Sequence, residues 1–465
     1  MYRSTRYRPE GRRLRRASIG VTMSAVVLAS LVLAAAAGAG PLRNVYDDSA
    51  TPSWWTQVNG SGASADAATS VLADGGGAYV AGWAGNAAGN FDATLARFTA
   101  AGTQKWLKRY DGPAHKADAV WKLAKGPSGT VYGAGWSQAG NGKNDILVVK
   151  WSSSGDRLWA KRYDGAQHGA DAAVAVGVDK YGDVTVAGSS EGAHGTDFVV
   201  VKWSKSGVRR WAWRYDGSGH LNDAATDIRM ESGGTTYVTG RVKLAGPQDA
   251  ALTVKFSRPG VKLWSRVYRG TSSLGADATS IAARPAGGVY VGGWTMSAVT
   301  AKDGLVLRYN SAGTGVALPP AVAAGDQVFA DFAVTTNRRI VAVGSSTAGG
   351  NGDLFAGVWA NETSAPSFGA TGGAFDDGLT AITADAFGGY YMTGYNRTAP
   401  NLSQITTYRR SLVTGGGGFN SVWGPALGLD VPAAVAVSGT TAYVVGLHYM
   451  GPAEGWNQVV LTYIY

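Results

Sequence analysis

The chain of 465 residues contains no cysteine, so neither disulfide bonds nor a lipid-modified cysteine can form. Runs of residues that favour helices are scarce. Neither a His-Glu-x-x-His helix nor a phosphate-binding loop occurs. Beyond residue 10 the glutamates are limited to Glu191, Glu231, Glu362 and Glu454, so acid–base hydrolysis would fall mainly to aspartate pairs.

An excess of positive charge is also largely missing from the body of the chain. The formal net charge is +10, but residues 1–16 contain seven arginines and one glutamate, which contribute +6. The remainder is therefore near +4 over more than 400 residues. We expect no nucleic-acid partner on this balance.

The N-terminus has the pattern of an export signal. The arginines are followed by an apolar, alanine-rich run from Ile19 to Ala37 and by the small residues Ala37-Gly38-Ala39. This predicts a signal peptide over residues 1–39, a linker over 40–52, and a secreted or cell-envelope protein. An uncleaved membrane anchor is the alternative, and only in that case do we expect contact with a membrane.

What the sequence has in abundance is glycine, with 68 residues, and a repeat. An aspartate followed by an apolar run recurs at spacings of 49 to 54 residues, as Asp66, Asp118, Asp171, Asp223, Asp277, Asp326, Asp377 and Asp430. Each copy reads as four short strands of alternating Val, Trp and Tyr between Gly, Asp and Ser turns. One copy cannot bury its own apolar faces, so the copies must pack on one another.

This period predicts an all-β chain: a single closed β-propeller with eight four-stranded blades over residues 53–465. The second half of the repeat is less regular, so seven blades remain the alternative. Ser53-Trp54-Trp55 matches an outer strand, and the last blade lacks its fourth strand. We therefore expect the N-terminal strand to complete the last blade, which removes an open sheet edge.

The repeat resembles the SBBP-type β-propeller repeats of exported bacterial proteins. The resemblance rests on W-x-x-R-Y-D-G, then D-A, then V-Y-V-x-G, then D-x-x-V-V-K, and it covers about 53–465. It implies export and a propeller, although that family is named for seven blades and has no general activity. The Gly-x-x-x-Trp turns also look like the tryptophan-docking turns of eight-bladed quinoproteins, but Trp151 stands where their aspartate is expected.

The residues repeated in every blade could have either a structural or a ligand-binding role. The eight aspartates either form a carboxylate ring that binds a cation or accept backbone N–H bonds, and repetition in every blade favours the second, structural role. Trp106, Trp159, Trp211 and Trp264 are expected to pack between blades. Trp83, Trp136 and Trp294 could instead stack on a sugar.

The long, variable loops are the predicted ligand-binding region. They connect outer strands to inner strands, and second strands to third strands, on one face of the ring. We predict that all five histidines lie there. Three share the register Y-D-G-x-x-H-x-x-D. They could hold zinc or copper, or each could bind its own aspartate. The candidate ligand-binding residues are His115, His168, His220, Glu191, His194 and Trp136.

No motif specifies a reaction, and we expect neither a cofactor nor a catalytic residue. The favoured function is a monomeric, non-catalytic binding scaffold for an extracellular protein or a polysaccharide. A glycan-active hydrolase or lyase is the alternative, and a quinoprotein-like oxidoreductase comes third.

Overall fold

The computed structural model describes residues 52–58, 66–246, 248–270, 273–298, 301–321, 325–347, 351–371, 375–399, 402–411, 419–424, 429–449 and 456–464. The predicted signal peptide lies outside these residues, as does most of the linker. The described residues form the strands β1 to β32 and one short 3-10 helix, η1 (Pro127–Gly129). No helix among them is long and apolar enough to cross a membrane.

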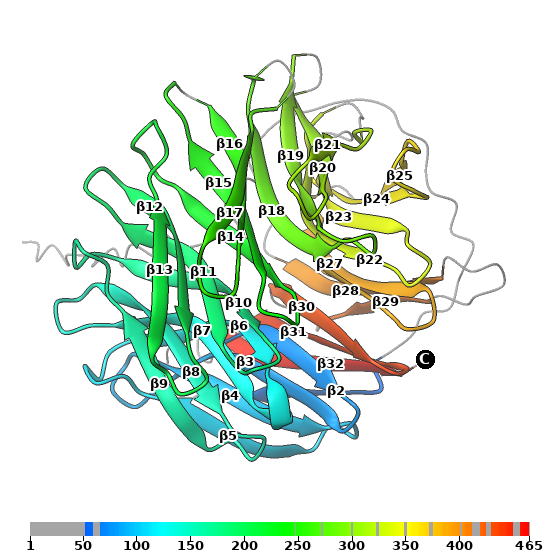
Figure 1. The fold of residues 1–465 in the computed structure, drawn as a ribbon. Helices are drawn as coiled ribbons and strands as arrows, with labels where there is room; N and C mark the ends of the chain where they lie inside the picture. Colours follow the sequence, from blue (N-terminus) through cyan, green and yellow to red (C-terminus); the bar gives the residue numbers. More distant parts are fainter. Residues whose placement is uncertain are drawn as a thin grey trace, which may run out of the picture. The chain divides into compact units, whose positions relative to one another are not determined.

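The strands make eight antiparallel sheets of four, arranged as the blades of a propeller (Figure 1). Blade 1 is β2 (Ala67–Asp74), β3 (Gly77–Gly85), β4 (Phe91–Thr99) and β5 (Gln104–Tyr110). Blade 2 is β6 (Asp118–Lys125), β7 (Val131–Gln138), β8 (Asn144–Trp151) and β9 (Arg157–Tyr163). Blade 3 is β10 (Asp171–Val178), β11 (Val184–Glu191), β12 (Thr196–Trp203) and β13 (Arg209–Tyr215). Blade 4 is β14 (Ala224–Met230), β15 (Thr236–Lys243), β16 (Asp249–Phe256) and β17 (Lys262–Tyr268).

The second half follows the same order from the innermost strand outward. Blade 5 is β18 (Ala276–Ala283), β19 (Val289–Ser297), β20 (Ala301–Tyr309) and β21 (Gly315–Ala317). Blade 6 is β22 (Gln327–Val334), β23 (Ile340–Ser346), β24 (Asp353–Trp359) and β25 (Ser367–Thr371). Blade 7 is β26 (Gly378–Ala384), β27 (Gly389–Ala399), β28 (Leu402–Ser411) and β29 (Phe419–Trp423). Blade 8 is β30 (Asp430–Ser438), β31 (Thr441–Tyr449), β32 (Trp456–Ile464) and β1 (Trp54–Val58).

The prediction of eight blades closed by the N-terminal strand is confirmed. β1 pairs antiparallel with β32, with Trp54 opposite Thr462 and Val58 opposite Gln458. The innermost strands β30 and β2 contact each other across the joint, and Figure 1 shows red β30–β32 beside blue β2. The two ends of the repeat therefore complete one sheet, and the outer side of β32 is paired.

The apolar cores lie between neighbouring blades. Each hydrophobic cluster combines residues of two adjacent blades, and the joint between blades 8 and 1 has its own cluster, including Val80, Phe98, Tyr443 and Val460. Within each sheet, a glycine of the second strand allows the close approach of the innermost strand. A Cβ added at Gly188 would lie 2.0 Å from the carbonyl oxygen of Ala172 in the paired strand. The blades thus hold one another together, as expected for a unit that cannot bury itself.

Every innermost strand carries a β-bulge at the same position, which the sequence pattern did not reveal. The register shifts once in each first-to-second strand pair, for example between Ala68 and Ser70 and between Ala225 and Asp227. In four blades the bulged residue is a threonine whose hydroxyl donates to a carbonyl of the next blade. Thr69 Oγ1, for instance, lies 2.7 Å from the oxygen of Val120. The bulges bend the strands and aim polar groups across the blade junctions.

Candidate functional site

The long-loop face is built from the outer-to-inner loops and the second-to-third loops, as predicted. In blades 2 to 4 the chain enters the innermost strand through Asp-Gly-x-x-His. The three histidines adopt left-handed backbone angles, with φ of 51° at His115, 50° at His168 and 48° at His220. Each backbone N–H donates to the carbonyl of the loop glycine at 2.9–3.0 Å. Such angles are uncommon for a residue with a side chain, and the bond to the loop glycine supports them.

Each of these imidazoles binds the aspartate four residues before it. Nδ1 lies 2.6 Å from Asp111 in His115, 2.6 Å from Asp164 in His168, and 2.7 Å from Asp216 in His220. The three histidine side chains are 80%, 75% and 63% exposed. Among the described residues Nε2 of these three histidines has no hydrogen-bond partner, and the ring of His220 also contacts that of His194.

The hydrogen bond to the aspartate, followed by its charge, raises the pKa of all three imidazoles above the usual value. The protonated form is therefore favoured. As the pH falls, these imidazoles become protonated at a higher pH than a free histidine does. This arrangement matches the reading in which each histidine binds its own aspartate. The groups of side chains that could hold a metal ion contain no histidine among the described residues.

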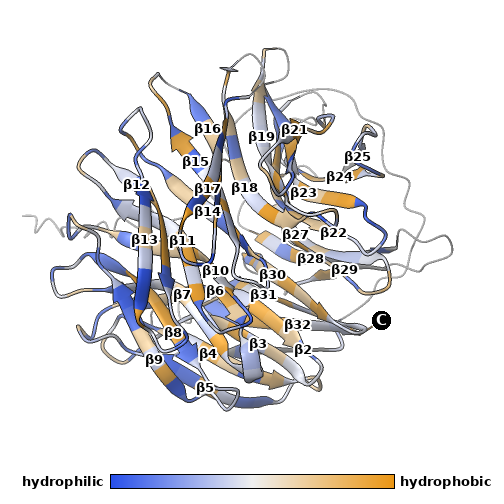
Figure 2. Ribbon diagram, in the orientation of Figure 1, coloured by the Kyte–Doolittle hydropathy of each residue, from blue (hydrophilic) through white to orange (hydrophobic). Residues whose placement is uncertain are grey.

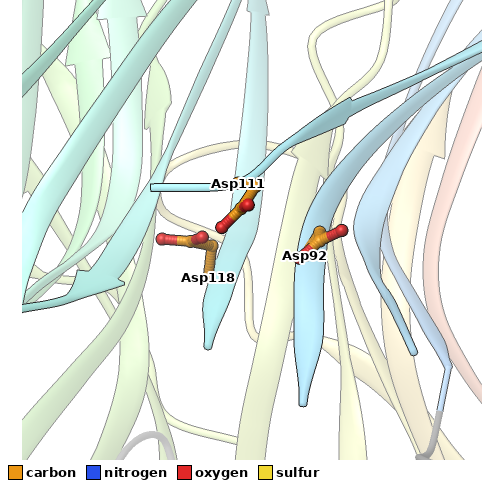
Figure 3. A group of neighbouring side chains, drawn as sticks. All are labelled: Asp92, Asp111 and Asp118. Atoms are coloured by element: carbon orange, nitrogen blue, oxygen red, sulfur yellow. The ribbon is translucent and has the colours of Figure 1, made fainter. Parts of the chain in front are cut away.

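Those groups are three aspartate triads, one beside each histidine loop. Their carboxylate atoms lie within 4.8 Å of one another in Asp92–Asp111–Asp118, Asp145–Asp164–Asp171 and Asp197–Asp216–Asp223. Figure 3 shows the first triad, with Asp111 and Asp118 turned toward each other and Asp92 beside them. The middle residue of each triad is exposed and the other two are buried.

Each buried carboxylate of the first triad already has a structural contact. Asp118 accepts a hydrogen bond from the Gly112 N–H at 2.7 Å, and Asp92 lies 3.6 Å from the Arg109 guanidinium. Burial raises the pKa of Asp118 to about 6, despite the bond from Gly112. The other two triads repeat this geometry with Arg162 and Arg214. The triads could hold a cation chemically, but their buried carboxylates already bind an arginine of the same blade or the N–H of the entry loop.

The repeated aspartates have such contacts elsewhere in the ring too. Asp66 accepts from the N–H of Gly85 at 2.6 Å, and Asp377 accepts from that of Arg397 at 2.6 Å. Asp326 accepts from the Lys302 N–H at 3.1 Å. Asp277 lies 3.8 Å from Arg241, and its Oδ1, like that of Asp118 and of Asp171, has no hydrogen-bond partner.

Two of the predicted positions are wrong. His448 does not lie in a loop; it belongs to β31, is 2% exposed and binds Asp430. Trp136 is 6% exposed and packs edge-on against Phe91, with ring centroids 5.8 Å apart. It lies on the second strand, where side chains face the neighbouring blade, so it presents no surface for a sugar.

The remaining candidates do lie on the long-loop face. His194 is exposed in the loop between β11 and β12, and its ring centroid is 5.8 Å from that of His220. Glu191 accepts from the Ala170 N–H at 2.7 Å and from Lys143 Nζ at 3.2 Å. The structure thus groups His194 with His220, while Glu191 braces the loop of His168.

Sequence reasoning missed Asp92 and Asp145 as members of this face. Both lie at the start of the third strand of a blade, a position that is also aspartate at Asp197, Asp303 and Asp353. The recurrence of aspartate at this strand position could have marked both residues as candidates. What the repeat could not show is that this aspartate meets the inner aspartate of the following blade.

No family model matches this chain. The regulatory protein FlaEY of Caulobacter vibrioides is 29% identical over a match that covers 33% of this chain and 20% of FlaEY. This chain therefore matches only a fifth of that protein's length.

Among solved structures, Sqt1 from Chaetomium thermophilum superposes with a TM-score of 0.52 at 12% identity, covering 86% of this chain and 96% of Sqt1. The polysaccharide lyase Uly1 reaches a TM-score of 0.45 at 7% identity, over 85% and 89% of the two chains. The likeness to Sqt1 supports the β-propeller fold and carries no inference about activity.

Proposed function

We propose that this protein is a non-catalytic β-propeller that binds a polar ligand, a glycan or an extracellular protein loop, on its long-loop face. The carrying observation is the row of exposed imidazoles, held in the same geometry at three consecutive blade junctions by Asp111, Asp164 and Asp216. Long loops on a rigid scaffold are where recognition is usually placed. The resemblance to SBBP-type repeats and the export pattern of residues 1–39 support a place outside the cytoplasm.

The bonding of the nearby acids favours binding over catalysis. A glycosidase needs two carboxylates that both reach the substrate. In the first triad Asp118 and Asp92 are buried and engaged with Gly112 and Arg109, which leaves the exposed Asp111, itself bound to His115. Gly188–Gly192 has the letters of a Gly-x-Ser-x-Gly elbow, but its central Ser190 is buried in β11.

Binding should depend on pH through the histidines. Because their pKa is raised, lowering the pH through the range in which they become protonated adds positive charge to the exposed ring edges. An acidic ligand would therefore bind more tightly at pH about 5.5 than at pH about 8.

The test is a glycan array, followed by affinity measurements on the ligands that it identifies. His115, His168 and His220 are changed together to alanine, and Ser154, Lys180 and Lys205 on the opposite face serve as the control set. We expect the histidine variant to lose at least about tenfold in affinity and the pH dependence, and the control to keep both. Turnover of a polysaccharide that disappears when Asp111, Asp164 and Asp216 become asparagine would instead establish an enzyme.

A further inference from the structure

The outer strands of blades 1 to 4 are basic. β5, β9 and β13 carry three lysines or arginines each and β17 carries two, and none of the four contains an aspartate or glutamate. The outer strands of blades 5 to 8, β21, β25, β29 and β1, contain no charged residue. Figure 2 shows blue segments along β5, β9 and β13 at the edge of the ring. The net charge of the chain conceals this segregation.

Protection of a sheet edge explains part of this pattern. An unpaired outer strand invites pairing with another chain, and proteins block it with charges or keep the edge short. β5, β9, β13 and β17 have seven residues each, whereas β21 has three and β25 has five. Either sign of charge would block an edge, however, so protection does not explain the exclusive use of cations.

Some of these cations have structural contacts. Arg109, Arg162 and Arg214 pair with buried aspartates of their own blades. Arg266 donates to the carbonyls of Gly313 and Ser265. Six more cations are exposed, and among the described residues no carboxylate pairs with them: Lys105, Arg157, Lys161, Arg209, Arg210 and Lys262. We call these six residues the basic rim. The nearest acid on this edge is Asp156, whose carboxylate lies 3.9 Å from Lys108 Nζ.

Aromatic and aliphatic groups separate the cations of the basic rim. Arg157 lies over the ring of Tyr110 at 5.4 Å, and Arg209 lies over Tyr163 at 5.5 Å, each reaching back to the preceding blade. Lys262 likewise lies over Trp213 of blade 3 at 5.9 Å. Leu158 beside Arg157 and Leu263 beside Lys262 are 51% and 52% exposed. The rim therefore combines cations with exposed apolar side chains, and its cations contact the preceding blade at three blade junctions.

We propose that the basic rim binds a chain of acidic polysaccharide along the outer edge of blades 1 to 4. Its carboxylate or sulfate groups pair with the rim cations, and the apolar faces of its sugar rings lie on the exposed aliphatic side chains beside them. This surface is separate from the long-loop face, so the proposal stands or falls independently of the proposed function.

The shape of the edge favours a flexible polymer. The rim follows four of the eight blades, half of the ring, and a planar membrane or a stiff duplex would touch such an arc at only one place. Single-stranded nucleic acid also bends, but it relies on rings that stack between bases. Trp159 and Trp211 are half-buried, and their Nε1 groups donate to the turns of the next blade. The export pattern at the N-terminus also favours a ligand found outside the cytoplasm.

The experiment measures binding of the purified full-length protein to polygalacturonate, dextran sulfate and neutral dextran by biolayer interferometry at several salt concentrations. The rim variant changes Lys105, Arg157, Arg210 and Lys262 to glutamine. The control variant changes Lys125, Lys180, Arg229 and Arg338 to glutamine; these are exposed cations close to the turns between first and second strands. Both variants remove four positive charges, so any difference reports position and not net charge.

We expect wild type to bind both acidic polymers and not dextran, with affinity falling as salt rises. The rim variant should bind at least about tenfold more weakly at low salt, and the control should stay within about twofold of wild type. The alanine variant of the three loop histidines should bind polygalacturonate as wild type does. Equal losses in the rim and control variants, or no binding of wild type to either acidic polymer, would overturn the proposal.

Two further measurements complete the test. If poly(U) or phosphatidylglycerol vesicles bind wild type more tightly than the polysaccharides, the assigned ligand class is wrong. If the rim variant does not fold, lysine acetylation of wild type replaces it. Polygalacturonate should then protect Lys105, Lys161 and Lys262 but not Lys180, and uniform protection would count against the rim.

Discussion

Blades 1 to 4 and blades 5 to 8 share one topology but join their blades by different contacts. In the first half, the indole nitrogens of Trp159 and Trp211 donate to carbonyls in the turn of the following blade. At the junction of blades 5 and 6 the contact comes from a third strand instead, since Trp359 at the end of β24 donates to the carbonyl of Pro319, which follows β21 of blade 5, at 2.9 Å. The bulged innermost strand, by contrast, occurs in all eight blades. The fold therefore depends on the inner strands, and the outer strands have diverged.

The charged residues also differ between the two halves on the face opposite the long loops, where short turns join the first strand to the second and the third strand to the fourth. Between blades 3 and 4, Arg258 of the later blade lies 3.3 Å from Asp179 and 2.9 Å from Asp183 of the earlier one. Between blades 5 and 6 the signs are exchanged, and Glu362 of the later blade binds Arg284 of the earlier one at 2.5 Å. The position requires complementary charges and does not require a particular residue.

The largest effect should come from removing the strand that joins the two halves. Deleting Trp54–Val58 leaves β32 as an open edge and removes its ladder. We expect loss of about 3–5 kcal/mol or complete unfolding, and aggregation. Thermal unfolding followed by circular dichroism, with light scattering, measures both. An unchanged melting temperature would show that blades 8 and 1 hold together through their core alone.

Removing a docking tryptophan tests whether the first half depends on this contact. Trp264 is 9% exposed, and its Nε1 donates to the Ser311 carbonyl at 3.2 Å. Trp264→Ala should cost about 3–5 kcal/mol in urea unfolding, because it empties a large buried site. Val316→Ala, on the outer strand of blade 5 and 52% exposed, is the control and should change stability by less than about 0.5 kcal/mol. Similar costs would contradict the contrast between the two halves.

In the second half, the ion pairs of Glu362 at the junction of blades 5 and 6 should contribute to stability. Glu362 binds Arg284, Arg308 and Tyr290, and the hydrogen bond from Arg284 leads in lowering its pKa to about 2. Because the folded pKa lies below the unfolded value, its stabilisation is present above pH about 4.5 and is lost as pH falls toward 2. Glu362→Gln should cost about 3 kcal/mol at neutral pH and little in acid. A pH-independent cost would exclude this linkage.

Asp277 should show the opposite pH dependence. Burial raises its pKa to about 7, so the folded state prefers the protonated form and stability falls as pH rises from about 4 through 7. Asp277→Asn should stabilise the protein by roughly 2 kcal/mol above pH 7, within a limit of about 4 kcal/mol set by the shift in pKa, and should be near neutral in acid. Asp223→Asn is the contrast, because Asp223 accepts N–H bonds from Gly217 and Lys243 and should not be improved by an amide.

The smallest effect concerns the three loop histidines of the first half. NMR titration should place the pKa of His115, His168 and His220 above that of a free histidine, and Asp164→Asn should lower the pKa of His168 alone. Any stabilisation from these pairs is present below the unfolded pKa and is lost as pH rises through the raised one. Because the pairs are exposed, we expect almost no change in melting temperature. An unshifted His168 would mean that its bond to Asp164 does not persist.

The sequence by itself predicted four strands in each blade and the closure of the ring, and it favoured eight blades over seven. Strand alternation, glycine turns and aspartate spacing are local properties, and the pairing of β1 with β32 followed from counting strands. The loop face and the turn face were also predictable, because antiparallel strands alternate direction.

Only the tertiary structure decided what each loop residue contacts. Trp136 and His448 looked like surface residues, but both face a neighbouring blade or strand and are buried. Asp92 and Asp118 come from different blades, and they meet because the blade junction brings the third strand of one blade beside the inner strand of the next. The basic rim has the same origin: cations about fifty residues apart gather on one edge because every copy of the repeat places its last strand outermost.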